Sequence, residues 1–162
     1  MKKAEIFSMH RVRGFTLLEL MITLTVAAVI LGLAVPAFQT TIAKNAVKSA
    51  TRDLVTTLNA ARAQSMSSRT PVTVTPEGGN WNNGWTMQYQ NSVESDETYV
   101  PSSRIQIRSA ITSLTFRPQG GRAAGANTLV VCHADADIPG RRVTVSFLGR
   151  VDTVEDTTGC DS

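Results

Sequence analysis

Beyond residue 14 the chain has no net charge. Four of the sixteen lysine and arginine residues and one of the thirteen acidic residues lie in the first fourteen positions, so that segment accounts for the formal charge of +3. The remainder carries twelve basic and twelve acidic side chains. A strongly basic protein built to bind nucleic acid over its whole surface is therefore excluded.

The chain also has few of the side chains that most often catalyse reactions. After residue 14 its only histidine is His133, which any Ser-His or Cys-His pair would have to use, and it has no Gly-x-Ser-x-Gly motif. Residues 132–137 read Cys-His-x-Asp-x-Asp and offer potential metal ligands. Calcium needs more oxygen ligands than these, and no glutamate closes the loop at the spacing of a known calcium site. We expect no enzyme activity, no metal and no cofactor.

A long apolar run follows a short basic leader. From Phe15 to Val35 there are 21 residues, and Glu19 is the only charged one. As a helix this run would be roughly 31 Å long, which is enough to cross the hydrocarbon core of a bilayer. We therefore expect a transmembrane segment over residues 15–38. The leader contains Lys2, Lys3, Arg11 and Arg13, which predicts that this end stays in the cytoplasm.

Glu19 needs an explanation, because a carboxylate in a membrane-spanning segment costs a few kcal/mol and usually has a partner. The nearest candidate is the α-ammonium that a cut before Phe15 would create, four residues away on the same helix face. The ammonium of a neighbouring subunit is a second candidate. The alternative is an ordinary signal anchor that carries a glutamate. Two features argue against it: no small-x-small cleavage site is present, and Gly14 directly follows a basic residue at the polar edge of the run.

The segment Gly14-Phe15-Thr16-Leu17-Leu18-Glu19-Leu20, with Pro36 well inside the helix, resembles the class III signal of type IV pilins and type II secretion pseudopilins. The resemblance implies that residues 1–14 are a leader peptide. It implies that a prepilin peptidase cuts between Gly14 and Phe15 and N-methylates Phe15. It also implies that Glu19 is the carboxylate used in assembly.

The helix is predicted to continue beyond the membrane. Apolar residues recur at helical spacing from Ala43 to Ala61, with charged residues between them, so residues 39–68 read as an amphipathic continuation. Pro36 lacks an amide proton and is expected to kink the helix. The helix should end near Ser67, because the residue before Pro71 avoids the α region.

From Val72 onward the pattern is that of a β-rich head over residues 69–162. Strands are predicted at residues 72–75, 86–90, 104–108, 111–117, 128–133, 141–148 and 150–154. Residues 91–103 read as an acidic loop and residues 118–125 as an exposed loop. The expected fold is α+β, with a long N-terminal helix packed on an antiparallel β-sandwich.

The turn Trp81-Asn82-Asn83-Gly84-Trp85, the strand-rich head and the late pair Gly149-Arg150 resemble the GspH/FimT family of minor pilins and pseudopilins. This implies a pilin-like fold. We expect the two tryptophans to form a hydrophobic clasp between the hairpin and the helix. An exposed platform for stacking sugars or bases is the alternative.

Cys132 and Cys160 are the only cysteines, and both lie in the part predicted to be periplasmic. An oxidising compartment favours a disulfide between them. By the chain-entropy argument such a bond would contribute about 3 kcal/mol. Two free thiols are the alternative.

DNA capture is the alternative to a purely structural role. Seven arginines lie between residues 104 and 150, against two aspartates. The residues that would contact phosphates are Arg122, Arg141, Arg142 and Arg150. Some members of the FimT type bind DNA through a Gly-Arg-x-Arg element. Here the matching stretch ends in Asp152, which weakens the alternative.

The sequence thus predicts a minor pilin or pseudopilin, a structural subunit of a type IV pilus or a type II secretion pseudopilus. Its expected partners are the prepilin peptidase, other pilins or pseudopilins, the inner membrane and, as the alternative, DNA. We expect a single-pass protein of the inner membrane with its head in the periplasm, which later enters the filament.

Overall fold

The structure is a computed structural model, and it describes residues 14–89, 96–125, 127–158 and 160; within it, the side chains of residues 33–37 are not described. Its first element is helix α1 (Leu17–Ser68), 52 residues long. The chain divides into two compact units, residues 1–38 and residues 39–162. Across the described part of the chain, no helix is long and apolar enough to cross a membrane. Residues 1–13 of the predicted leader, residues 1–14, lie outside the described residues.

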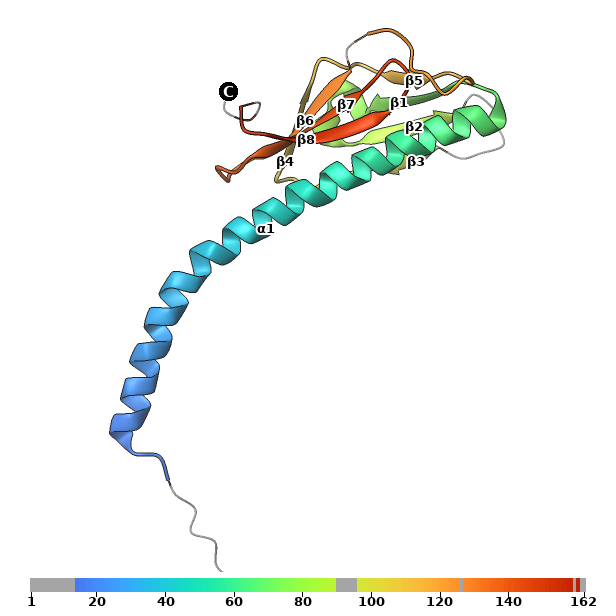
Figure 1. The fold of residues 1–162 in the computed structure, drawn as a ribbon. Coiled ribbons are helices and arrows are strands. Elements are labelled where there is room, and N and C mark those ends of the chain that lie inside the picture. The colour runs from blue at the N-terminus through green and yellow to red at the C-terminus, as the bar shows by residue number, and fades with distance from the viewer. Residues whose placement is uncertain (1–13, 90–95, 126, 159, 161–162) are drawn as a thin grey trace, which may run out of the picture. The chain divides into compact units, whose positions relative to one another are not determined.

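In the second unit, α1 lies along the strands of the head (Figure 1). The helix face that meets the strands is fully buried and consists of Ala43, Val47, Ala50, Leu54, Leu58 and Ala61. This spacing of three and four residues keeps the apolar side chains on one stripe, as the sequence pattern predicts. The helix ends at Ser68 because Arg69 adopts a left-handed conformation with a φ of 54°. That conformation is uncommon outside glycine and stops the helical repeat.

The described part of the head contains eight strands in two antiparallel sheets. The first sheet has the order β3-β2-β1-β5 and the second has the order β4-β6-β7-β8. The first consists of β1 (Val72–Pro76), β2 (Trp85–Tyr89), β3 (Glu97–Tyr99) and β5 (Leu114–Phe116). The second consists of β4 (Ile105–Ser109), β6 (Thr128–His133), β7 (Gly140–Val145) and β8 (Val151–Asp156). Two short 3₁₀ helices, η1 (Glu77–Gly79) and η2 (Trp81–Asn83), connect β1 to β2.

One core joins the helix to both sheets. Alternate residues of the strands point inward, as the pleat of a strand requires. The largest fully buried side chains on the strands include Trp85, Phe116, Leu129 and Val143. The α+β fold predicted from the sequence is confirmed.

Three strands differ from the prediction. β7 ends at Val145, three residues before the predicted end at Leu148. β3 lies in the segment expected to be a loop, residues 91–103; residues 91–95 of that segment, and residue 90 at the end of the strand predicted over 86–90, lie outside the described residues. The prediction missed β3 because this three-residue edge strand is largely exposed and pairs with β2 through its backbone, so it shows no apolar alternation. β5 is shorter than predicted. Ile111, expected to belong to it, is instead buried in the preceding turn, where its N–H donates to Ser109 Oγ at 3.0 Å.

Candidate assembly site

The residues of the predicted processing signal lie at the start of α1. Gly14, Phe15 and Thr16 precede the helix, and the Phe15 side chain is 78% exposed. A Cβ added at Gly14 would meet no atom within 4 Å. The junction that the peptidase is expected to cut is therefore open on all sides in the described structure.

Thr16 caps the helix. Its Oγ1 accepts a hydrogen bond from the Glu19 N–H at 3.2 Å, which satisfies one of the donors that every helix start leaves free. Thr16 and Glu19 have the spacing of a capping box, in which a threonine is followed three residues later by a glutamate. This role was missed in reading the sequence, although the Thr-x-x-Glu pattern before an apolar run was available to indicate it.

Glu19 is an exposed carboxylate among exposed apolar side chains. Its neighbours on either side, Leu18 and Leu20, are 68% and 54% exposed. Glu19 forms no ion pair with any described residue. Its position in the first turn favours a negative charge, since the free N–H groups there form the positive end of the helix dipole. The arrangement leaves the carboxylate exposed and available to a cation.

Pro36 lies inside α1, which is helical on both sides of it. Its side chain is among those that the structure leaves undescribed, so the kink at Pro36 stays a prediction.

The predicted disulfide is present between Cys132 and Cys160, with their Cα atoms 5.7 Å apart. It ties the C-terminal tail to β6. The bond lies against the start of β7, where a Cβ added at Gly140 would collide with Cys160 Sγ. Glycine at this position allows the tail to approach the sheet closely.

His133 takes part in a backbone turn. Its Nδ1 accepts hydrogen bonds from the N–H groups of Asp135 and Ala136, both at 3.1 Å. Among the described residues no three His, Cys, Asp or Glu side chains gather where they could hold a metal ion. Cys132 is in the disulfide, so the ligand set considered from the sequence does not form in the described part of the head.

The two tryptophans are buried. Trp81 is 3% exposed and Trp85 0%. Trp85 Nε1 donates to Thr57 Oγ1 on the helix at 3.1 Å, and Trp81 Nε1 donates to the Ile111 carbonyl at 2.7 Å. The clasp between hairpin and helix is present, and neither ring is available as an exposed stacking platform.

Tyr99 extends this clasp to the edge strand β3. Its ring centroid lies 4.6 Å from that of Trp85, and its hydroxyl donates to Asp53 Oδ2 at 2.6 Å. Burial, followed by the hydrogen bond to Asp53 and the charge of that carboxylate, raises the pKa of Tyr99 to about 12. The protonated phenol is therefore the form that joins β3 to the helix.

The arginines considered for DNA binding do not form one surface, and Arg122 is a clear correction. The sequence predicts it in an exposed loop, but its side chain is buried, at 9% exposure. Its Nε donates to the Val145 carbonyl at 2.9 Å, and its Nη1 donates to the carbonyls of Ala123 and Gly125 at 2.8 and 3.1 Å. The loop joins the two sheets, and the guanidinium satisfies backbone carbonyls that no strand reaches. The donors on Nε and Nη1 are therefore not available to phosphates.

The other three arginines point in different directions or are already paired. Arg141 and Arg142 are consecutive on β7 and so face opposite sides of the sheet. Arg142 forms an ion pair with the buried Asp156 at 2.8 Å. Arg150 pairs with Asp152 at 2.8 Å, at the far end of the β7–β8 ladder from Arg141. Asp152 thus stands where the Gly-Arg-x-Arg element would have its second arginine, and it also pairs with the first, Arg150.

Comparison with known proteins agrees with this description. The chain matches the family of the type II transport protein GspH over residues 50–149. It matches the prokaryotic N-terminal methylation motif over residues 9–35. No curated protein matches the chain.

Two crystal structures of the type IV minor pilin FimU from Pseudomonas aeruginosa have a similar fold. One is 19% identical with a TM-score of 0.55, and the match covers 68% of this chain and 90% of that one. The other is 21% identical with a TM-score of 0.51, and the match covers 66% of this chain and 91% of that one. The GspH match spans more than half of the chain and includes the C-terminal part of α1 and most of the head. The chain therefore belongs to the GspH family of type II transport proteins, with a prokaryotic N-terminal methylation motif ahead of a pilin-like head.

Proposed function

We propose that this protein is a minor pilin or pseudopilin that a prepilin peptidase cuts between Gly14 and Phe15. Before assembly it is held in the inner membrane by residues 15–38, with its head in the periplasm. Afterwards it is a subunit of a type IV pilus or of a type II secretion pseudopilus. The observation that supports the proposal is the match to the N-terminal methylation motif over residues 9–35, at the start of a helix that continues into a pilin-like head.

The first step of the proposed assembly is the pairing of two opposite charges. The cut creates an ammonium on Phe15, four residues from Glu19. Pairing with this ammonium, or with that of a neighbouring subunit, offsets the cost of a carboxylate in an apolar environment. A pair between neighbours also fixes their axial register, because an offset by one turn would leave both charges unpaired.

Apolar packing then holds the filament together. Around Glu19 the first unit exposes a series of large apolar side chains: Leu17, Leu18, Leu20, Met21, Ile22, Leu24, Val26, Val29, Ile30 and Leu31. A surface of this kind marks a place for lipid or protein contact. In the membrane lipid covers it, and in the filament the helices of neighbours do.

In this proposal the head contributes contact surfaces to the filament and no reactive side chains. Its histidine is engaged by backbone N–H groups, its cysteines are bonded to each other, and its tryptophans are in the core. The disulfide suits a head that folds in an oxidising compartment.

The test is Glu19→Ala in cells that make the filament. We expect normal membrane insertion and cleavage but loss of the subunit from sheared filaments, because the ammonium then has no carboxylate to pair with. Glu97→Ala, which removes an exposed acid of the head, is the matched control and should assemble normally. Glu19→Ala subunits recovered in filaments at the wild-type level would contradict the proposal.

A further inference from the structure

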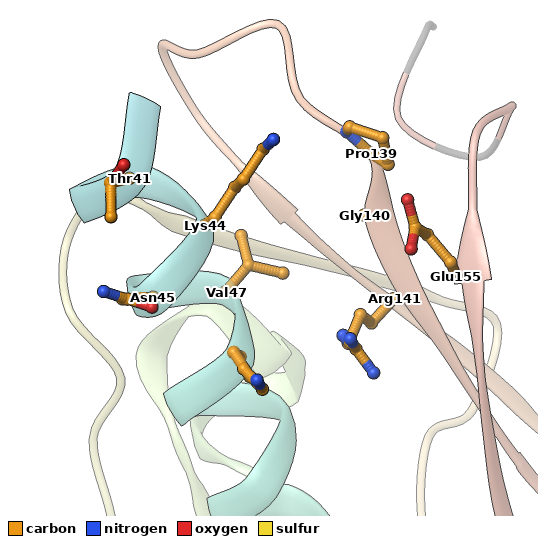
Figure 2. A pocket seen from close by; sticks show the side chains of 9 residues that line it. Thr41, Lys44, Asn45, Val47, Pro139, Gly140, Arg141 and Glu155 are labelled. Carbon is orange, nitrogen blue, oxygen red and sulfur yellow. The ribbon is translucent and has the colours of Figure 1, made fainter. Parts of the chain in front are cut away.

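A hollow of about 350 Å³ opens between α1 and the edge of the second sheet, within the compact unit 39–162 (Figure 2). Its charged lining residues are Lys44 and Lys48 on the helix, Arg141 on β7 and Glu155 on β8. In Figure 2 the side chains of Lys44 and Val47 extend from the helix toward the side on which Arg141 and Glu155 lie. An adjoining hollow is lined by Lys48 and Arg141 again, together with Arg52. We call these two hollows the basic groove.

The basic groove has more positive charge than the chain neutralises. It contains four cationic side chains, and the one carboxylate in its lining is Glu155. Within the described structure, none of the four cations forms an ion pair or a hydrogen bond with a protein group. By contrast, Arg142 on β7 and Arg150 just before β8 each have a carboxylate partner. The groove is therefore suited to an anion from outside the chain.

The helical cations are regularly placed. Lys44, Lys48 and Arg52 recur every four residues, which puts them on one face of α1. No acidic residue occurs between Glu19 and Asp53. The charged residues between Phe38 and Asp53 are thus all basic.

Chain length places the groove close to the end of the apolar run. Lys44 follows Phe38 by six residues, which is about 9 Å along a helix and at most about 22 Å in any conformation. The potential of an anionic membrane surface falls off within a Debye length, about 8 Å at physiological salt. Along the helix, Lys44 therefore lies about one Debye length from the end of a membrane-held segment 15–38, which puts that end of the groove at the border of the headgroup potential.

We infer that the basic groove binds the phosphate headgroup of an anionic phospholipid, such as phosphatidylglycerol, while the subunit waits in the membrane. The inference rests on the proposed function, since it requires the apolar run to lie in lipid. Basic pockets between membrane-spanning helices hold anionic headgroups on the cytoplasmic side of membranes, and the same charge pairing would apply on the periplasmic side, where the proposed function places the head. Val47 and Pro139 in the lining offer apolar contact for the glycerol part.

A headgroup fits the groove better than the other anions do. A nucleic acid presents a continuous row of phosphates, which Glu155 in the lining would interrupt by repulsion. The volume suits one small anionic group rather than a folded acidic surface. Assembly into the filament would replace the lipid with protein contacts. The groove would therefore hold lipid only while the unassembled subunit is in the membrane.

The experiment uses the full chain, purified in an uncharged detergent and titrated with phosphatidylglycerol or phosphatidylcholine, with retained lipid counted by native mass spectrometry. The groove variant is Lys48→Ala/Arg141→Ala. The matched control is Arg117→Ala/Arg150→Ala, which also removes two positive charges. Arg117 and Arg150 lie toward the far end of the head, where Ser65 Oγ bonds the Arg117 carbonyl. Thermal unfolding of each variant checks that the fold is kept.

We expect wild-type protein and the control to retain phosphatidylglycerol at least tenfold more tightly than phosphatidylcholine. The groove variant should lose that preference, and millimolar inorganic phosphate should not displace the lipid. Equal retention of the two lipids, or an equal loss in the control, would overturn the inference. So would displacement by inorganic phosphate, or retention of an oligonucleotide or an acidic peptide in place of the lipid.

Failure of the inference is separate from failure of the proposed function. A wild-type chain that is cleaved and enters filaments but shows no lipid preference refutes the lipid site alone. A chain that is not cleaved ahead of Phe15 refutes the proposed function, whatever lipid it retains.

Discussion

At the scale of residues, Glu19 carries the proposed function. It is the one charge in a run that is otherwise apolar from Phe15 to Val35. Energetics alone therefore single it out in the sequence, because an unpaired carboxylate is costly in lipid. The structure adds the hydrogen bond from the Glu19 N–H to Thr16, which explains why the helix begins at Leu17.

Gly14→Val tests the processing signal. We expect it to block cleavage, since the resemblance to prepilin signals implies a peptidase that accepts a small residue before the cut. The open space around Gly14 means that the added methyl groups should not disturb the described fold. An uncleaved band on a gel is the expected result. Wild-type cleavage of Gly14→Val would show that the glycine is not part of the signal.

Arg122→Met tests the structural role of the buried guanidinium. The substitution removes three hydrogen bonds to carbonyls and leaves those carbonyls without the donor. We expect a loss of about 3 kcal/mol in the free energy of unfolding. Tryptophan fluorescence reports the transition because both rings are buried. The exposed Arg117→Met should change stability by less than about 0.5 kcal/mol, and equal effects of the two variants would contradict this account.

At the scale of elements, periodicity predicted the helix and most of the strands. The stripe on α1 and the alternation in β1 and β4 are local patterns, and burial follows them directly. The position of Arg122 could not be read in this way, because its Nε bonds the Val145 carbonyl, 23 residues away. β3 could not either, because a largely exposed edge strand shows no apolar alternation. The ion pair of Arg142 also needed the structure, because its partner Asp156 lies on the neighbouring strand β8.

Tyr99→Phe tests the tie between β3 and the helix. With a pKa raised from the ordinary 10.0 to about 12, the phenol contributes stability that is fully present below about pH 10. This contribution is lost as the pH rises toward 12, because the folded state then gives up a proton that it holds more tightly than the unfolded chain does. The stability advantage of wild type over Tyr99→Phe should therefore be smaller at pH 11 than at pH 8, as measured by unfolding in urea. A stability difference between wild type and Tyr99→Phe that is the same at both pH values would contradict this prediction.

Gly149→Ala tests the turn between β7 and β8. Gly149 has a φ of 78°, and a Cβ there would collide with the Gly120 carbonyl. Gly79→Ala is the control. Gly79 has a φ of 77° and no atom within 4 Å of an added Cβ, so its substitution costs only the strain of the backbone conformation. We expect a loss of about 1 kcal/mol for Gly79→Ala and about 3 kcal/mol for Gly149→Ala. Melting temperatures would check this, and equal losses would show that the collision is relieved without cost.

At the scale of the whole molecule, each of the two compact units has its own task in the proposed function. The first unit contains the proposed processing signal, the proposed assembly carboxylate and the exposed apolar face. The second unit contains all the fully buried core residues, the disulfide and the basic groove. Composition could predict this division, because the apolar run ends where the amphipathic pattern begins. It could not predict the groove, which brings residues of α1 beside Arg141 and Glu155 of the last two strands.

The mass of the mature amino terminus tests the central claim most directly. Protein isolated from cells that contain the prepilin peptidase should yield an amino-terminal peptide that begins at Phe15 and has one N-methyl group. A mature chain that keeps Met1, or that begins at any residue other than Phe15, would contradict the account, since the ammonium would then be absent or misplaced with respect to Glu19.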